Sequence, residues 1–251
     1  MKYAIILLSS LLTSPFIQAK TDHPQDEGNV CQSQGAWVKA QYSLKAMQKD
    51  HVKGSTLTLW RKPNVVAHQY PDAHITQVWE HVHQRVKSTR FFDAYSRGIE
   101  YQPGDKVDGR VDNDWDYRNQ LLTPAFLATL SLQKTTGSGC NQQAVYTNGA
   151  TENAIQLVWL PQLQLISSLS MDNNDKEKTT WTLVSLEHNQ SDITAFFAQR
   201  NGYQTTDYAD IGDDHTDPFL TNMVNQGFIE AGASGFYDTE GRAIGSHSHH
   251  H

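Results

Sequence analysis

Short segments in which apolar and polar residues alternate are the feature that most constrains the fold of this 251-residue chain. A period of two places side chains of one kind on one face of a β-strand. Turns rich in proline, glycine, asparagine and aspartate separate the segments. Because strands joined by tight turns pair with their neighbours, the pattern favours an antiparallel sheet. The expected strands cover residues 55–60, 65–70, 75–82, 86–92, 97–102, 144–147, 154–160, 163–171 and 179–187.

Helical spacing and helix-start signals occur between and beside these strands. Trp37, Ala40, Leu44 and Met47 predict a first helix of about three turns that ends before Gly54. Residues 135–140 are predicted to form a polar loop. Further helices are expected to start at Thr123-Pro124, at Ser191 or Asp192, and at Asp217-Pro218.

The order of helix, strands, helix, strands and short helices predicts an α+β fold. We expect a curved antiparallel sheet, similar to half a barrel, with helices covering one face. Residues 35–230 are expected to form one domain, preceded by a flexible segment over 20–34. Residues 231–251 are expected to form a loose tail with a histidine-rich end.

Residues 1–19 have the pattern of a cleaved signal peptide. Lys2 supplies a positive charge, residues 4–12 are apolar, and the small residue Ala19 precedes the expected cleavage point. The apolar run is shorter than the roughly 20 residues that span a bilayer. The alternative is a buried N-terminal helix. We therefore expect export to the periplasm, with no stable membrane span in the mature protein.

Charge argues against one class of partner. The chain carries 20 basic and 27 acidic residues, a net charge of −7. Nucleic-acid binding depends on clustered lysine and arginine, so a nucleic-acid partner is not expected.

Cys31 and Cys140 are the only cysteines. In an oxidising compartment an even pair is typically bridged, so a disulfide is expected between them. Two buried thiols or a metal-binding pair are the alternatives.

Three segments carry a resemblance to a known group: LTLWRKPNVVAHQYP, RVKSTRFFDAYSRGIEYQPGD and LVWLPQLQLISSLSM. Their strand pattern resembles that of the periplasmic half-barrel proteins, which include the lipoprotein carrier LolA, the lipoprotein receptor LolB and RseB-type stress sensors. The resemblance covers residues 35–187 and rests on element order, length and compartment. It implies a sheet that holds an acyl chain or an apolar peptide beneath its helices.

An apolar-ligand face of this kind would be lined by large side chains from several strands. The alternative is that the same side chains form an ordinary core, because leucine and tryptophan in strands are typical of any core. The candidates are Leu57, Leu59, Trp159, Leu163, Leu165 and Trp181.

Three segments are candidates for a metal site that binds zinc, copper or calcium. His81 and His83 would share one face of a strand and need a third ligand; solvent-facing histidines are the alternative. Residues 207–217 form an acidic loop that could hold calcium or be solvated. The histidines of the tail could bind copper, nickel or zinc, or could be the remnant of an expression tag. The loop and tail candidates are Asp210, Asp213, Asp214, His215, His247, His249, His250 and His251.

No nucleophile motif, HExxH motif or glycine-rich phosphate loop occurs in the sequence. We therefore expect a non-enzymatic carrier or accessory protein that binds an apolar ligand or an envelope protein. A periplasmic metal-handling protein is the alternative function. The sequence indicates no cofactor other than the zinc, copper or calcium of the candidate metal sites.

Overall fold

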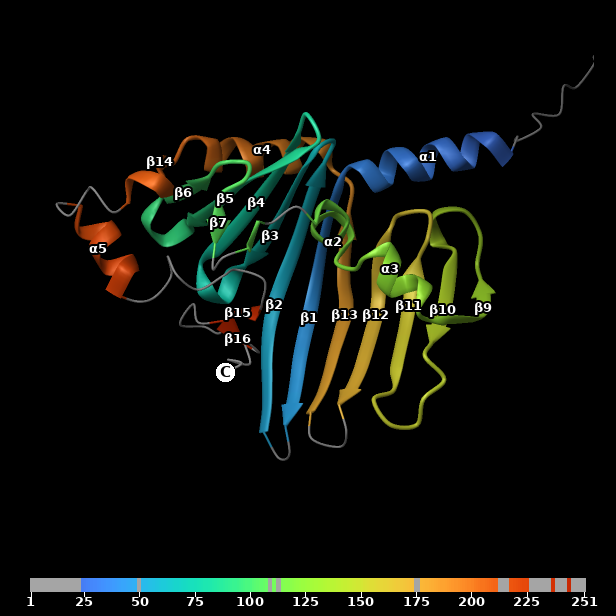
Figure 1. Ribbon diagram of the computed structural model, residues 1–251. Helices are drawn as coiled ribbons and strands as arrows, with labels where there is room; N and C mark the ends of the chain where they lie inside the picture. Colours follow the sequence, from blue (N-terminus) through green and yellow to red (C-terminus); the bar gives the residue numbers. More distant parts are fainter. Residues whose placement is uncertain are drawn as a thin grey trace, which may run out of the picture.

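One curved 12-stranded sheet dominates the computed structural model (Figure 1). The structure describes residues 24–48, 51–107, 110–111, 114–173, 177–211, 217–225, 236–237 and 243–244. The sheet contains β1 (Val38–Gln48), β2 (His51–Lys62), β3 (Val65–Tyr70), β4 (Ile75–Val82), β5 (Arg85–Phe92), β6 (Arg97–Tyr101), β9 (Ser131–Thr136), β10 (Gln143–Thr147), β11 (Ile155–Leu160), β12 (Leu165–Asn173), β13 (Glu177–Glu187) and β14 (Gln204–Asp207).

Two further pairs of strands are short. They are β7 (Lys106–Val107) with β8 (Arg110–Val111), and β15 (Phe236–Tyr237) with β16 (Ala243–Ile244). The α-helices are α1 (Pro24–Ala36), α2 (Trp115–Gln120), α3 (Pro124–Ala128), α4 (Gln190–Asn201) and α5 (Pro218–Asn225). The 3-10 helices are η1 (Pro71–Ala73), η2 (Asp93–Tyr95), η3 (Gly139–Asn141) and η4 (Tyr208–Asp210).

The strand order is β14-β6-β5-β4-β3-β2-β1-β13-β12-β11-β10-β9, so β14 and β9 are the two ends of an open sheet. Neighbours pair antiparallel except β14, which runs parallel to β6. The predicted α+β class and the curved antiparallel sheet are therefore confirmed. Within the described residues, no helix has the length and apolar character required to cross a bilayer.

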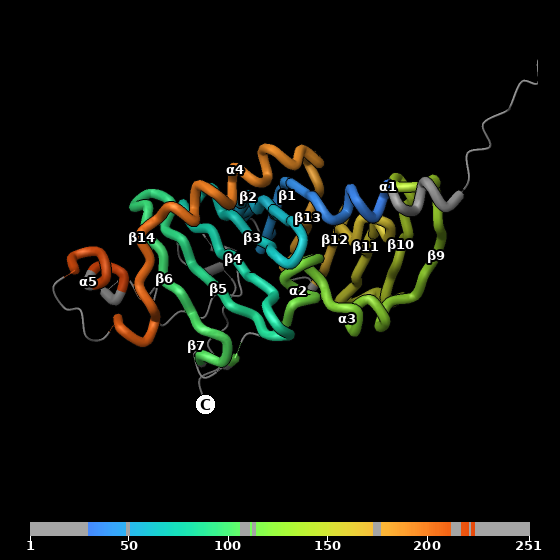
Figure 2. Tube along the Cα trace, turned by 90° about the horizontal axis from the view of Figure 1, so that it is seen from above, coloured from blue at the N-terminus to red at the C-terminus, as the bar shows by residue number. Residues whose placement is uncertain are grey.

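Helices pack on both faces of the sheet, whereas the sequence predicted one covered face (Figure 2). The aromatic side chains of α4, Phe196 and Phe197, pack with Trp60 and Phe91 on one face. On the opposite face, side chains of α2, α3 and α5 join the larger core. Two adjacent strand residues point to opposite faces, so a single strand contributes to both clusters.

The predicted helix that begins at Trp37 is wrong, because Val38–Gln48 forms strand β1. Val38, Ala40, Tyr42 and Leu44 are buried in alternation, which is the period of a strand. The residues that suggested helical spacing overlap this period-two set. Pairing with β2 on one side and β13 on the other decides the conformation.

Two other local expectations differ from the structure. Helix α1 occupies most of the segment that was expected to be irregular. Helix α4 is capped by Asn189, which accepts hydrogen bonds from the backbone N–H groups of Ser191 and Asp192, so the cap lies two or three residues before the expected Ser191 or Asp192. The predicted starts at Thr123 and Asp217 are confirmed by hydrogen bonds from the N–H groups of Phe126 and Phe219.

Two buried polar side chains bind backbone carbonyls beneath α2. Arg61 donates to the carbonyl oxygens of Leu163 at 2.6 Å and Asn119 at 2.8 Å, joining β2 to the turn before β12 and to α2. Burial lowers the pKa of Arg61 to about 10, so it stays charged at neutral pH. The Nε2 atom of His68 lies 2.7 Å from the carbonyl oxygen of Arg118 and donates to it.

Helix α4 is held by an aromatic stack, and we expect that stack to be worth several kcal/mol. The rings of Phe196 and Trp60 are 3.9 Å apart and nearly parallel. Phe196→Ala leaves a cavity and is expected to lower the free energy of unfolding by about 3 kcal/mol or more. Urea unfolding measures the change. Val184→Ala is the control: Val184 is 63% exposed, so its change should stay within about 0.5 kcal/mol. Equal effects of both substitutions would contradict this role for the stack.

Candidate functional site

The six residues of the predicted apolar-ligand face do come together, but inside the main core. Each is less than 10% exposed, and all belong to the cluster that packs against α2 and α3. Phe126 and Leu127 of α3 pack against this cluster. A ligand would have to displace these helices to reach the face, so ligand binding there stays a prediction.

The two histidines of the predicted metal pair do not lie together on one strand face. His81 is in β4, with its ring stacked on Trp115 at a centroid distance of 5.0 Å. His83 is in the turn that follows β4 and has a φ of 49°. Because the turn reverses the chain, the alternation that would align the two imidazoles ends at Val82. The predicted arrangement is therefore wrong.

The acidic loop is described only in part. Asp207 accepts hydrogen bonds from Gln102 and the N–H of Ala209, which lower the pKa of its carboxyl group. Asp217 forms an ion pair with Arg97, whose hydrogen bond is the main cause of its lowered pKa. Asp210 is exposed in η4. Asp213, Asp214, His215, His247, His249, His250 and His251 lie outside the described residues.

The described part of the chain contains no group of three or more histidine, cysteine or acidic side chains that could hold a metal ion. The described residues therefore give no support to zinc, copper or calcium binding.

The predicted disulfide between Cys31 and Cys140 is confirmed. It joins α1 to η3, the turn between β9 and β10. Among the α1 side chains that the structure describes, residues 30–36, only that of Cys31 is buried. The covalent bond thus ties the helix to the turn between β9 and β10, and the carbonyl oxygen of Gln34 lies 2.8 Å from Nδ1 of His188.

On the face opposite the core, strands β1 and β10–β13 carry mainly serine and threonine side chains, with two valines, one glutamine and one lysine among them. We call this the hydroxyl face. The strand register aligns its residues in two rows across the strands. Neighbouring members are about 4.8 Å apart across the strands, and the rows are about 7 Å apart. The first row is Ser43, Thr182, Ser168, Val158 and Val145, and the second is Lys45, Thr180, Ser170, Gln156 and Thr147.

Among the described residues, α4 packs on the same side as the hydroxyl face but over the other half of the sheet, so no described helix packs over the two rows. Trp60, which stacks on α4, is paired with Lys39, and Lys39 precedes Ser43 by four residues on β1. Residues two or four apart in a strand share a face. Thr182 and Gln156 are exposed, and the other serine and threonine members of the rows are half-buried.

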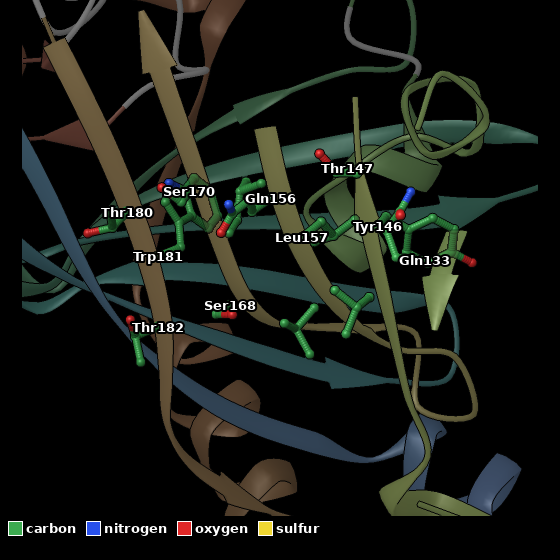
Figure 3. A pocket seen from close by; sticks show the side chains of 13 residues that line it. Gln133, Tyr146, Thr147, Gln156, Leu157, Ser168, Ser170, Thr180, Trp181 and Thr182 are labelled. Carbon is green, nitrogen blue, oxygen red and sulfur yellow. The ribbon is translucent and has the colours of Figure 1, made fainter. Parts of the chain in front are cut away.

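A hollow of about 470 Å³ lies over β9–β13 (Figure 3). Its lining residues are Gln133, Val145, Tyr146, Thr147, Gln156, Leu157, Val158, Ser168, Leu169, Ser170, Thr180, Trp181 and Thr182. Leu157, Leu169 and Trp181 have their side chains in the core. Tyr146 also packs against the core. The accessible side chains of the lining are therefore mainly those that the two rows contribute from β10–β13, together with Gln133 of β9, and the hollow opens on the hydroxyl face.

The chemistry of the hollow is uncharged. Its lining contains no aspartate, glutamate, lysine, arginine or histidine. Serine and threonine hydroxyls both donate and accept hydrogen bonds, and so does the glutamine amide. The two valines, Val145 and Val158, add small apolar patches between them. Such a surface fits a neutral ligand that alternates hydrogen-bonding and apolar groups.

Strand β9, at the margin of the hollow, was missed by the sequence analysis, which predicted a loop over 135–140. All six of its residues are exposed, so the segment has none of the apolar alternation that marks a half-buried strand. The sequence does carry one signal of the hydroxyl face. Serine or threonine occurs at alternating positions, 168 and 170 in one strand and 180 and 182 in the next. Only the register shows that these pairs are neighbours.

No protein-family model matches the sequence, and no curated protein is significantly similar to it. Solved structures give only weak similarity. PNGF-II is 9% identical with a TM-score of 0.38, and the match covers 75% of this chain and 33% of that one. MucB in the Pseudomonas aeruginosa MucA/MucB complex is 11% identical with a TM-score of 0.31, covering 67% of this chain and 59% of that one.

A putative outer membrane lipoprotein-sorting protein domain from Vibrio parahaemolyticus is 6% identical with a TM-score of 0.30, covering 69% of this chain and 97% of that one. This chain thus spans about a third of PNGF-II and under two thirds of MucB. The matches include MucB and a lipoprotein-sorting domain, as the resemblance to periplasmic half-barrel proteins predicted, and they are weak. With TM-scores below 0.5, these similarities carry no argument about function.

Proposed function

We propose that this chain is an exported, non-catalytic accessory protein that holds an uncharged stretch of another envelope protein on its hydroxyl face. The observation that carries the proposal is the uncovered, uncharged hollow over β9–β13. Export is supported by the Cys31–Cys140 disulfide, because such bonds persist in oxidising compartments.

The chemistry of the lining favours a polypeptide over an acyl chain. A hydroxyl or amide that is covered by hydrocarbon loses its water without gaining a hydrogen bond, which costs about 1–3 kcal/mol per group. The rows present several such groups, including Ser168, Ser170 and Gln156. A polypeptide backbone offers a donor and an acceptor at nearly every residue, so it can replace the lost water.

Filling the hollow should abolish partner binding. The probe is a photoreactive benzoylphenylalanine placed at Gln156, an exposed residue of the lining, in cells with an intact envelope. Ultraviolet light is expected to give an adduct with another protein. Ser168→Arg puts a bulky charge into the uncharged hollow and is expected to reduce the adduct at least tenfold.

Val82 supplies the matched controls, because it is 45% exposed and belongs to β4 in the other half of the sheet. The photoreactive residue at Val82 should give no adduct, and Val82→Arg should leave the Gln156 adduct unchanged. Thermal melting checks that both arginine variants fold. Equal labelling from both positions, no adduct from Gln156, or a bound lipid mass in native mass spectrometry would contradict the proposal.

A further inference from the structure

Strand β9 is an end of the sheet, and its outer edge is paired with no strand that the structure describes. Its inner edge pairs with β10. An open edge presents backbone N–H and C=O groups that can pair with another extended chain. β9 is six residues long, and every one of them is exposed. The edge is thus long enough and accessible enough to receive a strand.

The two rows of the hydroxyl face reach this edge. Val145 of the first row is paired with Lys134 of β9, and Thr147 of the second row is paired with Ser131. Gln133 of β9 also lines the hollow. Lys134 pairs with Val145 and Leu132 pairs with Tyr146, so Gln133 is an extra, bulged residue, and the row positions Ser131 and Lys134 are three residues apart. A chain added beside β9 that follows this bulge would extend both rows, and its side chains at these positions would lie at the margin of the uncharged surface.

Charge distinguishes one position on the edge. Lys134 is the only charged residue of β9. It is exposed and forms no ion pair with any residue that the structure describes. Opposite charges on directly paired residues of neighbouring strands stabilise a sheet, and like charges destabilise it. A carboxylate is therefore the complementary group for the position beside Lys134.

We infer that the outer edge of β9 takes up an extended segment of the partner protein as an added strand. The segment places uncharged side chains over the hydroxyl face and a carboxylate beside Lys134. Backbone hydrogen bonds supply affinity, and the alternate side chains supply specificity. The inference rests on the proposed function, since it specifies how the same partner is held.

The test places benzoylphenylalanine at Leu132, which is 54% exposed on β9, in cells with an intact envelope. Mass spectrometry of the adduct identifies the crosslinked segment, which should contain an aspartate or glutamate among uncharged residues. Lys134→Glu places a negative charge beside the carboxylate of the bound segment and should reduce the adduct at least fivefold. Lys53→Glu, at an exposed position of β2, is the matched control and should leave the yield unchanged.

A synthetic peptide with the sequence of the crosslinked segment then serves as the probe for amide hydrogen exchange. Added to the purified protein, it should slow exchange of the β9 amides, and Lys134→Glu should remove that protection. A Leu132 adduct with a second copy of this chain, or no protection of β9, would overturn the inference.

Failure of the inference can be told apart from failure of the proposed function. If Ser168→Arg abolishes binding and Lys134→Glu does not, the partner lies on the hydroxyl face without joining the edge. That result overturns the inference and leaves the proposed function standing. If neither substitution changes the adduct, both are wrong.

Discussion

Replacing both members of the Cys31–Cys140 disulfide with serine is expected to lower the free energy of unfolding by about 4 kcal/mol. The two cysteines are 109 residues apart, and closing a loop of about 100 residues removes roughly 4–5 kcal/mol of chain entropy from the unfolded state. The bond also fastens α1, whose only buried side chain among residues 30–36 is Cys31. We therefore expect residues 30–36 to lose their hydrogen-exchange protection in the double variant.

Guanidinium unfolding of the oxidised protein and of the Cys31→Ser, Cys140→Ser double variant measures the difference. Adding dithiothreitol to the wild-type protein should reproduce the loss, and adding it to the double variant should change nothing. A difference below about 1 kcal/mol would show that the unfolded chain gains little freedom from losing the bond.

The second large effect is a loss of stability in acid that comes from His68. Burial, and to a smaller extent the positive charge of Arg118, lower the pKa of His68 from its ordinary value of 6.5 to about 3. The folded protein therefore holds His68 neutral. The contribution of neutral His68 to the free energy of unfolding is complete above pH 6.5. It falls by about 1.4 kcal/mol for each pH unit between 6.5 and 3.

His68→Gln removes the titratable imidazole, and the glutamine amide still offers a hydrogen-bond donor for the carbonyl oxygen of Arg118. Between pH 7 and pH 4.5 we expect the wild-type protein to lose about 3 kcal/mol more than this variant, as measured by urea unfolding. His83→Gln, at an exposed turn position, should keep the wild-type pH dependence. Parallel curves for the wild-type protein and His68→Gln would refute a buried neutral imidazole.

Residues that alternate in the sequence were predictable, and residues whose environment depends on distant pairing were not. Strands such as β3, β4 and β5 carry their alternation locally, so their limits were predicted to within a residue. β1 carries two periods at once, and its pairing with β2 and with β13, whose paired residues are 129 to 148 positions away, selects the strand. β9 is polar except for the exposed Leu132, and pairing with β10 makes it a strand.

The candidate site divides in the same way. The six residues of the apolar face were correctly grouped, because large apolar side chains at alternating positions converge in a core. Whether such a face is open or covered depends on where α2 and α3 pack, which residue spacing does not specify. The hydroxyl face was missed because serine and threonine are common in solvated strands. Their alignment across strands exists only in the register.

The central position of β1 has a consequence for the order in which the chain folds. β2 to β6 and β9 to β13 can each assemble by adding the next hairpin, which requires only nearby contacts. The two arrays join where Lys39 meets Glu187, across 148 residues. Contacts between residues so far apart in sequence form slowly, because the entropy cost of closing a long loop comes before the favourable free energy of the contact. We expect two partly formed half-sheets to accumulate early in refolding, with the pairing of β1 and β13 as the slow step.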